Sequence, residues 1–187
     1  MPDPALHLLA IPGSLRSGSF NRALARTLPQ LAPDGVRVDV WELHDVPLYN
    51  SDLDEDGQRP DSVVDLKGDI EAADGLILVS PEYNFGVPGV LKNAIDWASR
   101  PGFRSPMAGK PTGIMGASAG LSGTMRAQEQ LKLNLLGMVA QVFPHPGVAV
   151  RKAGDKVHDG HLTDEDTRSF VKGYLEEFTA WVRRVGG

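Results

Sequence analysis

The stretch LHLLAIPGSLRSGSFNRALA, residues 6–25, runs from an apolar strand through a turn into a helix, and it decides the fold. Residues 6–11 are almost continuously apolar, which is typical of a strand covered on both faces. Small residues and a single arginine, Arg16, form the turn, and a segment of helical period follows from residue 19. A strand that leads directly into a helix is the first half of a βα unit, so the sequence predicts an α/β protein.

The same alternation of apolar runs and helical segments continues along the rest of the chain. We expect strands at 6–11, 36–41, 75–80 and 112–118, a broken fifth strand at 137–150, and helices at 19–32, 60–73, 88–99, 122–136 and 163–184. Five βα units predict one domain over residues 1–187, with a flavodoxin-like, doubly wound, five-stranded parallel sheet in the order 2-1-3-4-5 and helices on both faces. Ligands of such sheets bind beyond the carboxyl ends of the strands, so we expect the site residues there.

The last predicted helix carries two further expectations. Thr163 and Asp166 stand at the spacing of a capping box, so we expect Thr163 to begin the helix. Four aromatic side chains then recur at intervals of four, four and three residues, which predicts a stripe packed on the sheet rather than a cofactor site. These residues are Phe170, Tyr174, Phe178 and Trp181.

The composition restricts the classes of protein to which the chain can belong. Of its 187 residues, 41% are hydrophobic and 23% charged, as in ordinary globular domains, and the net charge of -5 argues against a nucleic-acid partner. No apolar run approaches the roughly 20 residues that span a bilayer, and no basic region precedes the short apolar run near the N-terminus. We therefore expect a cytoplasmic protein with no membrane partner. Because cysteine is absent, redox chemistry requires a bound cofactor.

The turn after the first strand offers groups that suit a phosphate. Gly13 allows a sharp turn, and three serines bring hydroxyl and backbone N–H groups to the start of the helix, where anions bind. Arg16 adds a planar fork of donors that matches phosphate oxygens. The alternative is that the serines only cap the helix and Arg16 is solvated. The candidate residues of this turn are Ser14, Arg16, Ser19, Phe20 and Asn21.

The residues that are missing from this turn narrow the choice of phosphate ligand. Ser19 and Phe20 stand where a P-loop needs Lys and then Ser or Thr to reach a nucleoside triphosphate and magnesium. The turn also lacks the G-x-G-x-x-G pattern that lets a dinucleotide pyrophosphate approach the backbone. A monophosphate therefore fits this turn better than ATP or a dinucleotide does.

The segment SPEYNFGVPGV, residues 80–90, follows the third strand and forms a stiff, proline-containing loop. Backbone groups between Glu82 and Gly86 can hydrogen-bond the edge of a flat heteroaromatic ring, and Tyr83 and Phe85 offer stacking surface. The alternative is an ordinary proline-rich turn in which Tyr83 packs on its own loop. The candidate ring-binding residues are Pro81, Glu82, Tyr83, Asn84, Phe85 and Gly86.

A third loop of small residues, within 116–128, follows the fourth strand and leads into the next helix. Its Ser118, Ala119 and Gly120 are expected beside the ring, where a helix start stabilises negative charge on a reduced cofactor. Three such loops lie at consecutive strand ends of one sheet edge, one suited to a phosphate and two to a ring. Together they predict a mononucleotide site, and the mononucleotide with a flat redox-active ring is FMN.

Four segments of the chain carry a family resemblance: GSLRSGSFNRALA, SPEYNFGVPGVLKNAIDWASR, AGKPTGIMGASAG and GTMRAQEQL. They resemble the NADPH-dependent FMN reductase family, which includes bacterial chromate and quinone reductases. The most specific element is Pro81-Glu82-Tyr83-Asn84 followed by the run from Gly89 to Trp97. The resemblance covers nearly the whole chain.

This resemblance implies an FMN-dependent NAD(P)H oxidoreductase in which the cofactor itself is the catalytic group. A hydride would pass from NADPH or NADH to N5 of FMN, and quinones, azo compounds, flavins or metal oxyanions such as chromate would then take the electrons. The resemblance also implies that Ser14, Arg16, Ser19 and Asn21 bind the phosphate and ribityl region. It implies that the 81–86 loop binds the isoalloxazine, with Ser118 and Gly120 on its other side.

The alternative function is that of a flavodoxin-like, non-enzymatic electron carrier. Such carriers normally have a phosphate loop rich in Thr and Ser and a much more acidic surface, so Arg16 and the modest net charge argue against this alternative. NADPH and NADH stay open as co-substrates, although Arg22 and Arg26, close to the first turn, suit the 2′-phosphate of NADPH.

Two further interpretations concern partners and metals. The resemblance implies a homodimer, with a homotetramer as the alternative, because Arg126 matches a residue used in subunit contacts while Glu129 stands where an aromatic residue is expected. His158 and His161 flank the turn residues Asp159 and Gly160, so we interpret them as exposed loop residues and expect no metal.

Overall fold

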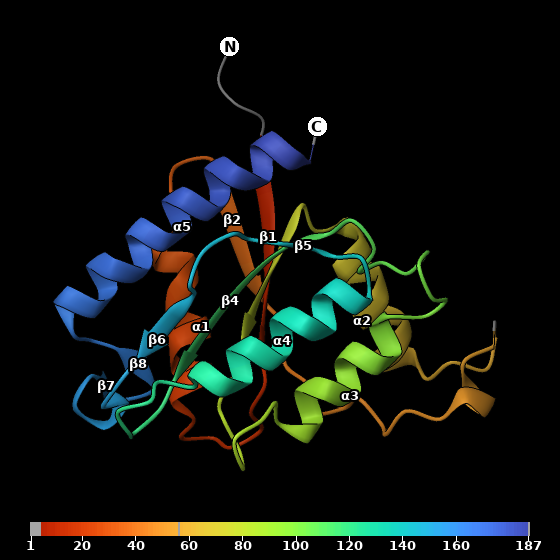
Figure 1. Cartoon of the computed structure of the whole chain (residues 1–187), viewed down its shortest axis with the longest axis horizontal. Helices are drawn as coiled ribbons and strands as arrows, with labels where there is room; N and C mark the ends of the chain where they lie inside the picture. The colour runs from red at the N-terminus through yellow and green to blue at the C-terminus, as the bar shows by residue number, and fades with distance from the viewer. Residues whose placement is uncertain (1–4, 56, 187) are drawn as a thin grey trace.

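The strand β1 (Leu6–Pro12) lies inside a parallel sheet, between β2 (Val36–Val40) and β3 (Gly75–Val79) (Figure 1). The computed structural model describes residues 5–55 and 57–186. Alternate side chains of β1 enter two separate clusters, because successive residues of a strand point to opposite faces. Leu8 and Ala10 belong to one cluster, and Leu9 and Ile11 to the other. Both faces of the sheet are therefore buried, as the apolar run of this segment predicts.

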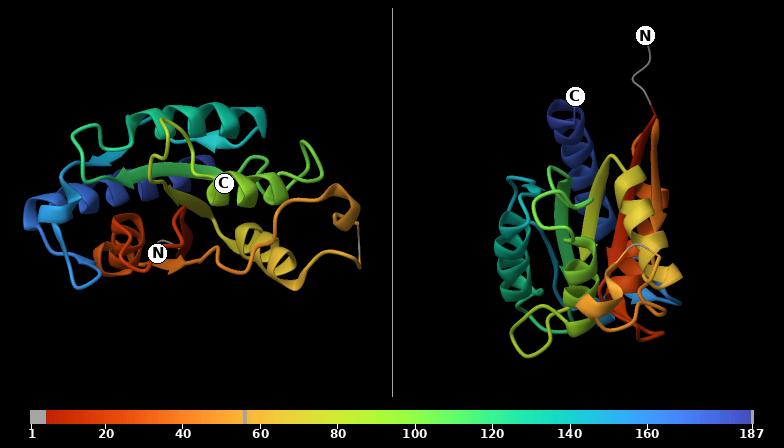
Figure 2. Two further views of the ribbon diagram at one scale, coloured as in Figure 1. Left: turned by 90° about the horizontal axis from the view of Figure 1, so that it is seen from below. Right: turned by 90° about the vertical axis from the view of Figure 1, so that its right-hand side faces the viewer.

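The remaining elements follow the expected order, except that the segment around His158 and His161, expected as a loop, forms a hairpin. The other strands are β4 (Pro111–Ala117), β5 (Gln141–Val142) and β6 (Val148–Val150), and a hairpin of β7 (Val157–His158) and β8 (His161–Leu162) precedes the last helix. The helices are α1 (Phe20–Leu31), α2 (Asp61–Ala72), α3 (Gly89–Ala98), α4 (Met125–Gly137) and α5 (Glu165–Val185), with short 3-10 turns η1 (Ser51–Leu53) and η2 (Ala153–Asp155). Helices α1 and α5 cover one face of the sheet, and α2, α3 and α4 cover the other (Figure 2).

The sheet has the order β2-β1-β3-β4-β5, with all its pairs parallel, which confirms the predicted doubly wound topology. The predicted break in the fifth strand is also confirmed. Strand β5 pairs with Pro111 and Thr112 of β4, and β6 pairs with Met115 to Ala117. Gly113 and Ile114, which lie between these two paired parts of β4, pair with neither β5 nor β6.

The hydroxyl of Tyr174, on α5, takes the place of the missing strand partner. It accepts a hydrogen bond from the backbone N–H of Ile114 at 2.9 Å and donates to the carbonyl of the same residue at 3.3 Å. A side chain on Gly113 would collide with this hydroxyl, because a Cβ there would lie 2.6 Å from it. Burial raises the pKa of Tyr174 well above its ordinary value, so the phenol stays protonated and can donate.

Two expectations for α5 are wrong. The helix is capped by Asp164, whose carboxylate accepts from the N–H of Thr167 at 3.0 Å, while the hydroxyl of Thr163 donates to the carbonyl of Lys156. Phe170 is 56% exposed, because Val171 takes the inward position in that turn. The other three residues of the predicted stripe are buried.

The helices of the described residues meet the sheet through their apolar faces. In α3, Leu91, Ile95, Trp97 and Ala98 are all buried. Across residues 5–55 and 57–186, no helix combines the length and the apolar character that crossing a bilayer requires.

We expect Tyr174→Phe to lower the free energy of unfolding by about 1–3 kcal/mol, because it leaves a buried N–H and a buried carbonyl of β4 without partners. Denaturant unfolding followed by circular dichroism measures the change. Tyr49→Phe is the control, since the Tyr49 hydroxyl has no hydrogen-bond partner within the described part of the chain. Equal stability of the two variants would contradict the role given to the Tyr174 hydroxyl.

Candidate functional site

All three predicted site loops lie at the carboxyl edge of the sheet, the lower edge in Figure 1. We call residues 13–19 the first loop, 80–88 the second loop and 118–124 the third loop; they follow β1, β3 and β4. The hydroxyls of Ser14 and Tyr83 lie 3.3 Å apart and join the first loop to the second. The structure therefore brings the predicted groups together from distant parts of the sequence.

The first loop leaves a row of donors unused. Among the described residues, no group accepts from the backbone N–H of Leu15, Arg16, Ser17 or Gly18. Gly13 packs against α3 so closely that a Cβ would lie 2.9 Å from the Leu91 side chain, which fixes the direction in which the chain leaves the strand. Ser19 caps α1 by accepting from the N–H of Arg22 at 3.4 Å. The serine cap of the alternative interpretation is thus present, and it leaves the loop amides available.

Arg16 is the cation of this loop that no carboxylate neutralises in the described part of the chain. Its guanidinium is exposed and lies 5.6 Å from the centre of the Phe20 ring. The neighbouring Arg22 and Arg26, which suited a 2′-phosphate, both pair with Glu42 at 2.7 Å. An incoming phosphate would therefore meet Arg16 as the available guanidinium.

Asn21 contributes differently from the expected phosphate contact. Its side-chain amide donates to the carbonyl of Ala117 and accepts from the N–H of the same residue, both at 2.9 Å. The side chain is buried, with 3% of the residue exposed. Asn21 thus fastens the first turn of α1 to the end of β4, where the third loop begins.

The second loop is a tight hairpin with exposed aromatic rings. Tyr83 and Gly86 exchange two backbone hydrogen bonds, at 3.1 and 3.0 Å. Asn84 and Phe85 between them have φ values of 50° and 66°, as in the type I′ turns that close two-residue hairpins. Tyr83 is 51% and Phe85 66% exposed, so both rings have free surface for stacking, whereas the backbone of Pro81 is buried beside the sheet.

The third loop is anchored to the segment that follows β6. The N–H of Ser118 donates to Val150 at 3.0 Å, and the carbonyls of Ser118 and Gly120 accept from Ala153 and Lys152 at 2.9 and 3.1 Å. Ala119 and Gly120 are exposed, and their N–H groups find no acceptor within residues 5–55 and 57–186. These amides are the donors that the third loop can offer to a ligand.

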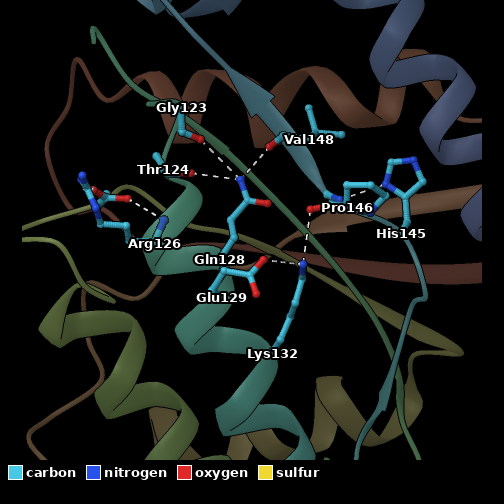
Figure 3. Close-up of polar contacts among 11 residues, drawn as sticks. Gly123, Thr124, Arg126, Gln128, Glu129, Lys132, His145, Pro146 and Val148 are labelled. Carbon is cyan, nitrogen blue, oxygen red and sulfur yellow. Dashed lines mark hydrogen bonds and ion pairs between the residues drawn. The ribbon is translucent and has the colours of Figure 1, made fainter. Parts of the chain in front are cut away.

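Buried Gln128, on α4, fixes the far end of the third loop (Figure 3). Its amide nitrogen donates to the hydroxyl of Thr124 at 3.1 Å and to the carbonyl of Val148 at 2.8 Å. Gln130, on the same helix, accepts from the N–H of Val87 at 3.1 Å in the second loop. Helix α4 therefore holds two of the three loops in place.

The residues present fit an FMN molecule. Free backbone amides and the unpaired Arg16 supply donors for a phosphate at one loop, while exposed aromatic rings and free amides supply a ring site at the other two. The first two loops are in direct contact through Ser14 and Tyr83, so phosphate and ring donors belong to one continuous surface. Ser14, Arg16 and Ser19 would hold the phosphate, and residues 81–86 with Ser118, Ala119 and Gly120 would hold the ring.

The fold and this donor set define a flavodoxin-like α/β flavoprotein. The chain belongs to the NADPH-dependent FMN reductase family, whose sequence profile matches residues 6–155. An NAD(P)H-dependent FMN reductase of Pseudomonas aeruginosa is 40% identical over 183 residues, which cover 97% of this chain and 98% of that protein. A quinone reductase of Escherichia coli is 40% identical over 185 residues, covering 96% of this chain and 97% of that protein.

A solved structure agrees with this family. FerB, a flavoenzyme NAD(P)H:(acceptor) oxidoreductase from Paracoccus denitrificans, superposes with a TM-score of 0.85 at 36% identity. The match covers 96% of this chain and 98% of that chain. The similarity thus extends over the fold and not only over the loop sequences.

Sequence reasoning missed the contacts that α4 makes with the second loop. Arg126 and Gln130 are four residues apart, so they share a face of α4, and both reach that loop. The i and i+4 spacing is visible in the sequence, but the position of the second loop against this face is not. The resemblance related Arg126 to subunit contacts only, and its pairing within the chain emerges from the structure.

We expect Arg16→Ala to weaken FMN binding roughly ten- to a hundredfold, because the charge-assisted hydrogen bonds to phosphate are lost. The fold should survive, since the side chain is exposed. Riboflavin lacks the phosphate and serves as the control, so its affinity should change little. Titration of both flavins into the two apoproteins measures this preference, and equal losses for both flavins would show that Arg16 only shapes the loop.

Proposed function

We propose that this chain is an FMN-dependent NAD(P)H oxidoreductase that reduces small acceptors such as quinones, azo compounds, flavins or metal oxyanions including chromate. The observation that carries the proposal is the contact of a loop with unpaired anion donors, at Arg16, with a loop of exposed aromatic rings, at Tyr83 and Phe85. Membership of the NADPH-dependent FMN reductase family supports the same cofactor and the same class of reaction.

When bound, FMN supplies a ring that accepts a hydride from NAD(P)H and passes electrons to the acceptor. The protein's part is to bind and to orient. Arg16 and the first-loop amides hold the phosphate, and Tyr83 and Phe85 line the ring. The free amides of Ala119 and Gly120 are the donors that would favour the negative charge that reduction adds. No acid or base side chain is needed at the ring.

The exposed surface around the second loop supports a broad choice of acceptor. Tyr83 and Phe85 present open aromatic faces rather than an enclosed pocket with fixed polar groups, so flat or small oxidants of several kinds can approach. The choice between NADPH and NADH is less constrained than the sequence indicated, because Glu42 already neutralises Arg22 and Arg26.

Three further expectations stay predictions. We expect residues 1–187 to act as one FMN-binding domain, and we expect the protein in the cytoplasm. We also expect a homodimer rather than a homotetramer. Exposed apolar residues on and just after α4 support subunit contacts there, namely Leu133, Leu136 and Val139.

The purified protein should be yellow and should release FMN, not FAD, when it is denatured. The reason is that the first loop offers one compact set of phosphate donors and no glycine pattern for a pyrophosphate. Chromatography of the released flavin against FMN and FAD standards makes the measurement. Release of FAD, or failure of the apoprotein to take up FMN, would overturn the cofactor assignment.

NADPH or NADH alone should bleach the flavin absorbance band under anaerobic conditions. A flavodoxin-like carrier, the alternative function, would stay oxidised until a separate reductase was added. Stopped-flow absorbance with each nucleotide distinguishes the two functions and gives the nucleotide preference. Subsequent addition of a quinone should restore the band, and a requirement for a reductase would replace the enzyme proposal with the carrier.

A further inference from the structure

Helix α4 begins without a capping side chain of its own. Its N-cap residue, Thr124, has a φ of 68° and makes no side-chain capping bond, and the first turn contains no acidic residue. The N–H groups of Arg126 and Ala127 instead donate to Oε2 of Glu82, at 3.0 and 3.3 Å. Glu82 lies in the second loop, 44 residues before Arg126 in the chain. The second loop therefore supplies the cap of the helix that follows the third loop.

The charge of Glu82 is balanced within the protein. The guanidinium of Arg126 donates to Oε1 at 3.1 Å, and only 10% of the Glu82 side chain is exposed. A carboxylate buried to this extent is stable only when it is hydrogen-bonded and paired, and here the helix N-terminus adds positive potential. Both carboxylate oxygens are bonded inside the chain, so the Glu82 side chain faces α4, while its backbone stays part of the loop proposed to bind the ring.

The tip of the second loop is held by the same face of α4. Gln130 accepts from the N–H of Val87 at 3.1 Å and donates to the carbonyl of Phe85 at 3.4 Å. The Arg126 guanidinium lies 4.5 Å from the centre of the Phe85 ring. Figure 3 shows Arg126 at the start of α4, two residues before Gln128. The N-terminal half of α4 thus contacts the second loop both at Glu82 and at the tip of the hairpin.

The second loop needs such support because its conformation is costly. Phe85 has a φ of 66°, in the left-handed region that a bulky residue rarely adopts. Its ring and that of Tyr83 are largely exposed, so burial of these rings does not hold the hairpin. The hydrogen bonds and the ion pair to α4, together with the contact between the Tyr83 and Ser14 hydroxyls, keep the hairpin in place.

We propose that Glu82 and Arg126 are positioning residues for the flavin ring: the pair fixes the second loop against α4 and balances the charge beside the ring site. The proposal rests on the proposed function, since it assumes that the second loop binds the isoalloxazine. Because the pair acts on the ring side, its loss weakens FMN and riboflavin alike and leaves the preference for FMN unchanged. Loss of Arg16, in contrast, should weaken FMN binding while riboflavin affinity changes little, so the preference for FMN should fall.

The pair also sets the electrostatic balance of the site. Reduction adds negative charge to a flavin ring, so a nearby carboxylate opposes reduction and a nearby guanidinium favours it. Removal of the Glu82 charge should therefore raise the midpoint potential of bound FMN. Removal of the Arg126 charge should lower it. A residue that served only to stabilise the fold would not give shifts of opposite sign.

The test compares Glu82→Gln and Arg126→Gln with two controls on the same helix, Glu129→Gln and Lys132→Gln. The control residues pair with each other at 2.8 Å and undergo the same charge changes without touching the second loop. Titration of the apoproteins should show a roughly tenfold loss of affinity for both flavins in the two test variants only. Dye equilibration of the FMN-loaded proteins should show the two opposite potential shifts.

Unchanged affinities, potential shifts of one sign in both test variants, or equal shifts in the controls would overturn the proposal. Arg126→Gln retains both backbone bonds to Glu82, so it keeps the test valid if Glu82→Gln fails to fold. Failure of the proposed function is separate, because it appears in the wild-type protein as a flavin that NADPH and NADH do not bleach. The positioning role is tested by the flavin affinities and midpoint potentials of the variants, and neither measurement requires NADPH or NADH.

Discussion

A parallel sheet covered on both faces by helices must end all of its strands at one edge, and every feature of this site depends on that constraint. Strands β1, β3 and β4 are adjacent in the sheet although their segments are far apart in the sequence. Their following loops are therefore neighbours before any side chain acts. The side chains then determine how firmly the three loops hold one relative position, and polar contacts supply part of that support.

Three polar contacts connect the segments that surround the site. Asn21 fastens α1 to the end of β4, the hydroxyls of Ser14 and Tyr83 join the first two loops, and Glu82 joins the second loop to α4. The same solution appears inside the sheet, where the Tyr174 hydroxyl replaces a strand partner for Ile114. The contacts of Asn21 and Tyr174 are buried, and buried hydrogen-bonding groups are costly when unpaired, so these two contacts specify one arrangement strongly.

The strands of the main sheet and the five helices were predicted because apolar runs and helical periods mark them locally, whereas the short β7–β8 hairpin was expected as a loop. Apolar runs such as residues 75–80 and the break near Pro144 and Pro146 translate directly into strands and a gap. The exact start of α5 and the residues on its buried face were less predictable. Asp164 and Thr163 are both residue types that cap helices, and Phe170 and Val171 are both apolar residues that differ in their angle around the helix. The candidate site loops were proposed from their composition, but the partners of Asn21 and Glu82 were not predicted, since these depend on long-range packing that no local pattern encodes.

The distribution of charge at the site follows from the same long-range contacts. Several charged residues lie near the three loops, but Arg22 and Arg26 are neutralised by Glu42, and Glu82 by Arg126 and the start of α4. Arg16 alone among these has no carboxylate partner in the described part of the chain. In the proposed site, a phosphate would therefore be attracted to the Arg16 end, and the ring side would carry the balanced pair of Glu82 and Arg126. The proposed orientation of the ligand, from phosphate to ring, therefore follows from which charged residues are paired and which are not, more than from the presence of any single residue.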